Sequence, residues 1–215
     1  LMEKLFLYLC MNSTEIFNAT TAAKELENTS VITIDSYIGA LEMSNLIYLA
    51  KPMDVGSKGA IKGKPKIFIA DAAIRNAVLM IDDVLSDESE LGAMVETTVY
   101  KHMASFYQGS PASLGYFRKA KDNQKEVDVV VELPRQKILC EVKYRSNSHI
   151  SSTDAIVELC KDEKSKVTNA FLVTKRLDDF GITKHETKTP IFRIPAIAFL
   201  YILGKAEAEG QNGRL

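Results

Sequence analysis

One stretch of the chain, residues 126–143, constrains the fold more than any other. Residues 126–132 and 138–143 each alternate apolar with largely polar side chains, which predicts two β-strands that each have one apolar face. Between them, residues 133–136 predict a tight turn, because Pro134 presets φ at its second position. The stretch therefore predicts an antiparallel hairpin centred on this turn.

The predicted hairpin gathers charged side chains on its polar face. With the turn at residues 133–136, Asp128 faces Glu141 and Glu126 faces Lys143. Mg²⁺ is a hard ion that prefers carboxylates and water as ligands, so Asp128 and Glu141 are candidate ligands for Mg²⁺ or Mn²⁺. The alternative is a solvated face with a cross-strand Glu126–Lys143 pair, worth at most about 1 kcal/mol.

The segments around the hairpin predict an ordered series of helices and strands. Apolar residues recur at helical spacing over residues 91–107, and Glu96 lies beside this apolar stripe. Residues 114–118 predict a short strand before the hairpin. After it, residues 151–154 give a capping signal for a helix, and residues 170–174 predict another strand. The predicted order is helix, three strands, helix, strand.

The spacing of Asp128, Glu141 and Lys143 resembles the active-site hairpin of the PD-(D/E)XK nuclease-like superfamily, whose core has this same order of elements. In that superfamily the Asp and Glu hold Mg²⁺, and the Lys orients or polarises the attacking water. The resemblance implies an α/β domain of the restriction-endonuclease-like αβββαβ type that acts on DNA. It implies metal binding by Asp128 and Glu141, water positioning by Lys143 and assistance by Glu96.

The resemblance extends over nearly the whole chain. The sequence is similar to the C-terminal region of prokaryotic AAA-type ATPases, in which a winged-helix segment precedes a PD-(D/E)XK nuclease-like domain. Two departures are Ala-Ala-Ile at residues 72–74, where the family usually has Gly-Leu, and Lys125, where it has Gly. The segments that carry the resemblance are the strand-to-helix residues 66–74, the Gly-x-x-x-Glu of residues 92–96, the aromatic-aromatic-Arg of residues 116–118, and residues 126–128 and 138–143.

The phosphate-binding part of an ATPase is missing from this sequence. It contains no Gly-x-x-x-x-Gly-Lys-Ser/Thr motif, and it begins at Leu1. We therefore expect a C-terminal fragment of a longer protein whose ATPase domain lies upstream. ATP binding would belong to that upstream domain, which would be a partner of the present chain.

Length and charge distribution predict two domains. A chain of 215 residues can hold two small domains, and the acidic run at residues 82–90 separates two regions of apolar periodicity. The predicted organisation is a winged-helix domain over residues 1–80, an acidic linker over 81–90, a nuclease-like domain over 91–204 and a disordered tail over 205–215. The final helix is expected to end at Gly204.

The predicted winged helix is poorly equipped to read DNA through its third helix. Residues 31–45, which include that helix, contain no Lys or Arg, whereas phosphate contacts need cations. The wing between strands predicted at residues 46–50 and 66–70 is basic. Lysines that could contact phosphates there are Lys58, Lys62 and Lys64, with Lys51 and Lys66 at its ends. The alternative is a solvated loop in a winged helix that binds protein.

Three further residues are candidates for contacting nucleic acid beside the predicted cation site. Arg118 either contacts a substrate phosphate or pairs with Glu126 or Asp128 across the sheet. Lys121 and Arg145 lie near the expected rim of the cleft.

Composition excludes several classes of site. The net charge is −1 and the isoelectric point about 6.4, so any nucleic-acid surface must be local. The three cysteines, Cys10, Cys140 and Cys160, share no metal-ligand spacing and fall on apolar faces, which predicts buried, reduced thiols in a cytoplasmic protein. No segment is long and apolar enough to predict a membrane span.

Three classes of function follow from these observations. The first is a Mg²⁺-dependent nuclease acting on DNA, favoured by the presence of Asp128, Glu141 and Lys143 together. The second is a non-catalytic DNA-binding or regulatory module. The third is a module for homo-oligomerisation and partner docking of the ATPase, favoured by the acidic third helix and the near-neutral charge.

Overall fold

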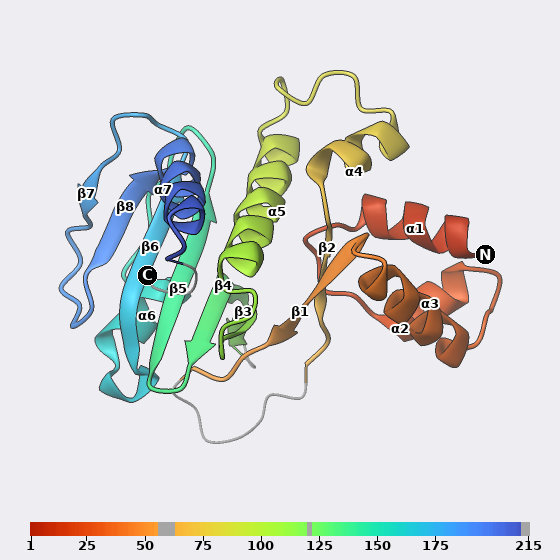
Figure 1. Cartoon of the computed structure of the whole chain (residues 1–215), viewed down its shortest axis with the longest axis horizontal. Coiled ribbons are helices and arrows are strands. Elements are labelled where there is room, and N and C mark those ends of the chain that lie inside the picture. The colour runs from red at the N-terminus through yellow and green to blue at the C-terminus, as the bar shows by residue number, and fades with distance from the viewer. Residues whose placement is uncertain (56–62, 120–121, 212–215) are drawn as a thin grey trace. The chain divides into compact units, whose positions relative to one another are not determined.

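The computed structural model describes residues 1–55, 63–119 and 122–211, with the side chains of residues 122–124 left out (Figure 1). The chain is of mixed α/β class and divides into two compact units. The first unit contains residues 1–51 and 63–101, and the second contains residues 52–62 and 102–215. In the part of the chain that is described, no helix combines the length and apolar character needed to cross a membrane.

The first unit contains the predicted three helices and two-stranded ribbon. The ribbon is antiparallel, with Ile47 facing Ile69. Two of the helices begin at side-chain caps, because Asn18 accepts a hydrogen bond from the Thr20 N–H and Ser30 accepts one from the Thr33 N–H. The elements in chain order are α1 (Met2–Met11), α2 (Ala19–Glu25), α3 (Val31–Met43), β1 (Ile47–Pro52), β2 (Lys66–Ile69) and α4 (Ala72–Leu79), followed by α5 (Glu88–Phe106), which supplies residues to both units.

An apolar core and one buried arginine hold the first unit together. The Arg75 side chain of α4 donates from Nε to the Cys10 carbonyl at 3.0 Å and also pairs with Glu90 of α5. This arginine therefore ties α4 to α1 and to the start of α5, within residues that the sequence predicted as an acidic linker. The core side chains include Leu5, Leu9, Ile34, Ile38, Leu41, Ile47, Ile67 and Ile69.

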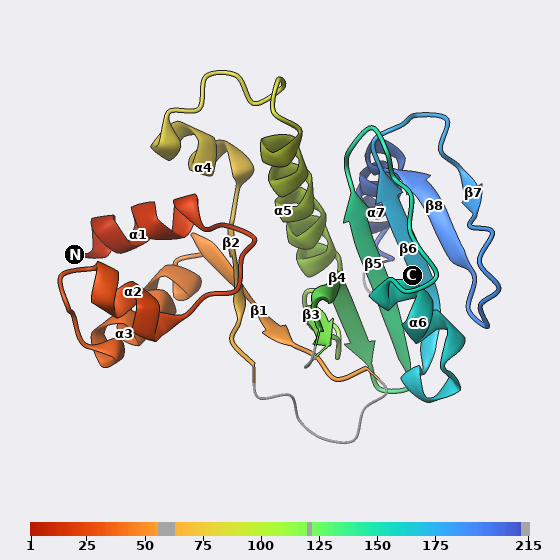
Figure 2. The same ribbon diagram turned by 180° about the vertical axis from the view of Figure 1, so that it is seen from behind.

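The second unit contains a mixed sheet in the order β3-β4-β5-β6-β8-β7. Strands β3, β4 and β5 are antiparallel to one another, β5, β6 and β8 are parallel, and β7 is antiparallel to β8. Helices α6 and α7 lie on opposite faces of this sheet, as opposite views show (Figures 1 and 2). The bounds are β3 (Ser113–Lys119), β4 (Asp122–Leu133), β5 (Gln136–Lys143), α6 (Ala155–Lys161), a 3-10 turn η1 (Glu163–Ser165), β6 (Val167–Thr174), β7 (Gly181–Ile182), β8 (Ile191–Pro195) and α7 (Ala196–Ala208).

The predicted order of helix, three strands, helix and strand is confirmed by α5, β3 to β5, α6 and β6. Strands β7 and β8 were not predicted from the sequence. Strand β8 is only five residues long and runs directly into α7, so its own pattern is too short to distinguish from the start of that helix.

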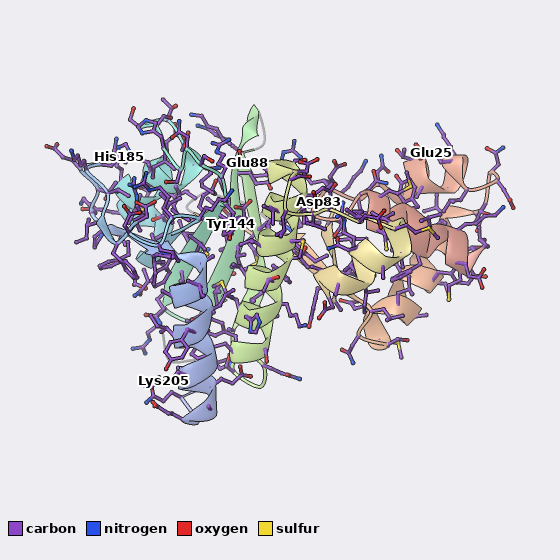
Figure 3. The ribbon with its side chains drawn as sticks, turned by 90° about the horizontal axis from the view of Figure 1, so that it is seen from above. Glu25, Asp83, Glu88, Tyr144, His185 and Lys205 are labelled. Carbon is purple, nitrogen blue, oxygen red and sulfur yellow. The ribbon has the colours of Figure 1, made fainter. Side chains whose placement is uncertain are left out.

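The prediction that the last helix ends at Gly204 is wrong. Helix α7 continues to Ala208, so the predicted disordered tail over residues 205–215 is helical in its first part, which includes Lys205 (Figure 3). A glycine inside a helix costs only about 1 kcal/mol. The following Ala-Glu-Ala favours helix, and the Glu207 carboxylate accepts a hydrogen bond from Ser105 at 2.7 Å. These contributions stabilise the helix beyond Gly204, as far as Ala208.

Strand β4 contains a β-bulge beside Asp128. Gly115 of β3 faces Val130, and Phe117 faces Val127, so β4 has one extra residue between these two pairs. Val127 and Val130 both pack in the same apolar cluster, whereas strict alternation would place them on opposite faces of the sheet. The predicted alternation over residues 126–132 is therefore wrong at the bulge, which changes the direction of the side chains next to Asp128.

Candidate metal and catalytic site

The hairpin that carries the candidate site has the predicted register. Its paired residues run from Leu133–Gln136 at the turn to Val129–Cys140. Asp128 and Glu141 are the next residues on the two strands, and the charges of both act on Lys143. That the two carboxylates face each other stays a prediction. The turn at Leu133–Gln136 is also confirmed.

Asp128 is held by the backbone of the neighbouring strand. Its Oδ2 accepts a hydrogen bond from the Val142 N–H of β5 at 2.7 Å. The side chain thus contributes to β4–β5 pairing next to the bulge. A carboxylate has about four lone-pair positions, so this hydrogen bond leaves Asp128 capacity to bind a cation.

Glu141 and Lys143 lie two residues apart on β5 and therefore on one face of the strand. Glu141 is buried, and the Lys143 Nζ donates a hydrogen bond to its Oε1. Burial lowers the pKa of Lys143, but the negative charges of Glu141 and Asp128 and the hydrogen bond to Glu141 raise it more, so the net pKa is above its usual value. Lys143 is therefore an ammonium at neutral pH in the metal-free protein, and it interacts electrostatically with both carboxylates.

Asp128 and Glu141 offer carboxylate oxygens, the type of ligand that Mg²⁺ prefers. Within the described residues, no group of three or more His, Cys, Asp or Glu side chains is placed to hold a metal ion. Mg²⁺ commonly binds through one or two carboxylates and keeps several waters. Asp128 and Glu141, with water and a backbone carbonyl such as that of Val142, would fit this coordination.

Glu96 has a structural partner. Its carboxylate accepts a hydrogen bond from the Lys66 Nζ at 2.9 Å, and the Lys66 side chain is only 6% exposed. Both residues belong to the first unit. The sequence suggested that Lys66 stands at one end of an exposed basic wing. The burial of its side chain shows that this is wrong. The assisting role of Glu96 in catalysis stays a prediction.

The other candidate residues lie in different settings. Arg118 faces Glu126 in the β3–β4 register, which favours the cross-sheet alternative for this arginine. Arg145 is exposed, and its Nε donates to the Asn147 carbonyl at 3.0 Å. Lys64 is exposed at the edge of the wing. The remaining candidates, Lys58, Lys62 and Lys121, lie outside the described residues.

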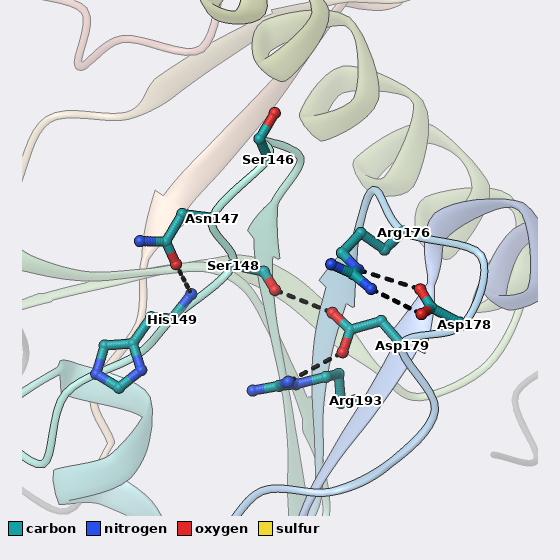
Figure 4. Close-up of a pocket in the computed structure, with 8 residues that line it drawn as sticks. All are labelled: Ser146, Asn147, Ser148, His149, Arg176, Asp178, Asp179 and Arg193. Atoms are coloured by element: carbon teal, nitrogen blue, oxygen red, sulfur yellow. Dashed lines mark hydrogen bonds and ion pairs between the residues drawn. The ribbon is translucent and has the colours of Figure 1, made fainter.

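A polar cluster at the carboxyl ends of β5 and β6 was missed by the sequence analysis (Figure 4). Ser148 donates to Asp179 Oδ2 at 2.9 Å, and Arg193 Nη1 donates to Asp179 Oδ1 at 2.9 Å. Burial raises the pKa of Asp179, but the hydrogen bonds from Arg193 and Ser148 outweigh it, and the net pKa is below its usual value. The available signal was the pair of adjacent acids, Asp178 and Asp179, four residues after the end of a predicted strand, because sites form at the carboxyl ends of parallel strands.

Comparisons with known proteins recognise two domains in the chain. Residues 91–194 match the family model named Domain of unknown function (DUF4143). Residues 1–85 match another, Domain of unknown function (DUF8612). DUF4143 is known to accompany AAA ATPases, which supports that part of the resemblance seen in the sequence. No curated protein matches the chain.

The contact between Asp128 and Val142 predicts how the metal-free protein responds to substitution. Asp128→Asn keeps an oxygen acceptor for the Val142 N–H and removes one of two close negative charges, so the free energy of unfolding should change by less than about 1 kcal/mol. Asp128→Ala loses the acceptor and should cost about 1–3 kcal/mol. Urea unfolding of both variants measures this. Equal losses for both would show that the charge of Asp128, rather than its hydrogen bond, supports the fold.

Proposed function

We propose that the second unit is a Mg²⁺-dependent phosphodiesterase of the PD-(D/E)XK nuclease-like type that acts on DNA. We propose that the first unit is a winged helix, and that both belong to a protein of the AAA-type ATPase family. The observation that carries the proposal is the convergence of Asp128, Glu141 and Lys143 at one end of the β4–β5 hairpin. The match of residues 91–194 to a domain that accompanies AAA ATPases supports the family context.

Each residue of the site has a distinct task in this proposal. Asp128 and Glu141 would hold Mg²⁺, which supplies charge neutralisation on the phosphate and activation of water. The Lys143 ammonium has three N–H donors, one of which is used on Glu141, so the others can orient a water or a phosphate oxygen. In the metal-free protein the carboxylates of Glu141 and Asp128 raise the pKa of Lys143, which is therefore a charged donor there.

Calorimetric titration with Mn²⁺ and Mg²⁺ tests the proposed metal site. The wild-type chain should give a binding heat that is lost in Asp128→Ala and Glu141→Gln. Glu132→Gln is a matched control, because Glu132 lies on the same strand near the turn and pairs with Lys137. It should keep the heat. Equal heats for the wild type and the Asp128 and Glu141 variants would remove the metal site and with it the proposed chemistry.

A second function, protein docking, is favoured for the first unit by α3. This helix carries no Lys or Arg, and its Ile32 and Met43 side chains are 82% and 86% exposed. Exposed apolar side chains on a helix whose charged residues, Asp35 and Glu42, are both acidic favour a protein partner, such as another copy of the chain or the ATPase domain, over DNA phosphates. A catalytically silent second unit that binds DNA or regulates the ATPase is the remaining alternative.

A further inference from the structure

Two adjoining pockets lie in the second unit and share residues. The first has a volume of about 400 Å³ and is lined by the polar side chains of the cluster around Asp179, together with Arg176 and Asp178 (Figure 4). The second, of about 240 Å³, is lined by more apolar surface, including Phe180 and Ile182. His149, Asp179 and Arg193 line both pockets, so the two adjoin, and we refer to them together as the depression, with a polar and an apolar part.

The depression lies beside the proposed cation site. In the sheet register Glu141 faces Leu172, and Leu172 faces Arg193, so Arg193 is two strands away from Glu141 on the same face. Neighbouring strands are about 4.8 Å apart, which places the two backbones roughly 10 Å from each other. A strand of nucleic acid cut at the cation site would therefore pass close to this depression.

The charges in the polar part cancel, which argues against a phosphate as the ligand. Arg176 pairs with Asp178 at 2.7 Å, and Arg193 pairs with Asp179 at 2.9 Å. A phosphate would meet two carboxylates as well as two guanidinium groups. A neutral group with both donors and acceptors at its edge fits this lining better. Nucleobases have such edges, and proteins read them with Arg donors and with Asp or Glu acceptors.

The apolar part offers a surface on which a base can stack. Phe180 is 62% exposed although it is a large aromatic residue. Its position is set by a turn, in which the Phe180 N–H donates to the Asp178 carbonyl at 3.0 Å, and by Gly181, whose φ of +134° favours glycine. The turn therefore places Phe180 in the lining of the apolar part, two residues after Asp178 of the polar part. Aromatic side chains bind unpaired bases by stacking.

We propose that this depression binds one unpaired nucleobase of the DNA strand whose phosphate is held at Asp128, Glu141 and Lys143. The base would stack on Phe180 and place its polar edge against Asp178 and the two arginines. This inference rests on the proposed function, since it names the form of substrate that the same site would take. It implies that the second unit prefers single-stranded DNA, or a frayed end, over intact duplex.

Fluorescence anisotropy without metal tests the inference. The probes are a fluorescein-labelled single-stranded 12-mer of mixed sequence and the duplex made from it. The single strand should bind at least about tenfold more tightly than the duplex. Phe180→Ala should weaken single-strand binding about 5- to 100-fold, in line with the effect of removing one stacking ring. Asp178→Asn, at another exposed residue of the pocket, should also weaken it.

A matched control is Tyr201→Ala, because Tyr201 is an aromatic residue on α7 with 68% exposure and does not line either pocket. It should bind like the wild type. Equal binding by Phe180→Ala and the wild type, or tighter binding of duplex, would overturn the base pocket.

Hydrolysis of a short single strand made only of abasic (tetrahydrofuran) sites, with Mn²⁺, separates this inference from the proposed function. That substrate has no base, so Phe180→Ala should hydrolyse it normally while Glu141→Gln should not. Normal hydrolysis with no effect of Phe180→Ala on single-strand binding overturns only the pocket. Absence of hydrolysis in the wild type, with single-strand binding that depends on Phe180, supports the pocket and counts against the phosphodiesterase.

Discussion

Replacing Glu96 by alanine is expected to lower the free energy of unfolding by about 3–5 kcal/mol, the usual cost of removing one member of a buried ion pair. The Lys66 side chain is 6% exposed and that of Glu96 is 16% exposed, with 2.9 Å between Nζ and Oε1. The pair lies beside the stacked rings of Phe68 and Tyr100, whose centroids are 4.3 Å apart. Water therefore cannot replace the lost carboxylate at low cost. Urea unfolding measures the change.

Two other variants make this result specific. Glu25→Ala removes an exposed carboxylate of α2 in the same unit and should change the free energy of unfolding by less than about 0.5 kcal/mol. The double variant Lys66→Met with Glu96→Leu should recover most of the loss, because a buried ion pair can often be replaced by apolar residues. A loss below about 1 kcal/mol for Glu96→Ala would contradict the structural role. If the double variant is stable but inactive, this result would support the assisting role of Glu96 in addition to its structural role.

The hairpin could be predicted because its information is local. The alternation over residues 138–143 and the turn at Pro134 are read within one short segment, and a two-strand register follows from the turn alone. The register as far as Val129–Cys140, just before Asp128 and Glu141, therefore followed from the sequence.

The features that the sequence did not reveal depend on contacts between distant segments. The bulge at Asp128 arises from pairing with β3, not from the hairpin itself. Glu96 and Lys66 are 30 residues apart. The sequence of α5 showed that Glu96 is an unusual acid beside an apolar stripe, but it could not show that Lys66 is its partner. Asp179 meets Ser148 and Arg193 from two other segments only once β5, β6 and β8 are assembled in parallel. The periodicity of one helix or strand does not show which distant side chains it will contact.

Replacing Lys143 by methionine is expected to reduce metal-dependent cleavage of DNA by at least about 100-fold while leaving cation binding in place. Positioned proton donors and acceptors typically contribute 10²- to 10⁴-fold to a rate. Methionine keeps the length and apolar stem of the side chain but removes the ammonium next to Glu141.

Single-turnover cleavage and Mn²⁺ calorimetry on the same preparations separate the roles of charge and metal. Glu141→Gln should lose both cleavage and the binding heat, whereas Lys143→Met should lose only cleavage. Lys161→Met, at an exposed lysine of α6, should retain both and controls for the loss of one positive charge. Cleavage by Lys143→Met at the wild-type rate would remove Lys143 from the mechanism. Residual cleavage that is identical in Glu141→Gln and the wild type would come from a contaminating nuclease, and would favour a non-catalytic role for this site because its carboxylates would then contribute nothing to turnover.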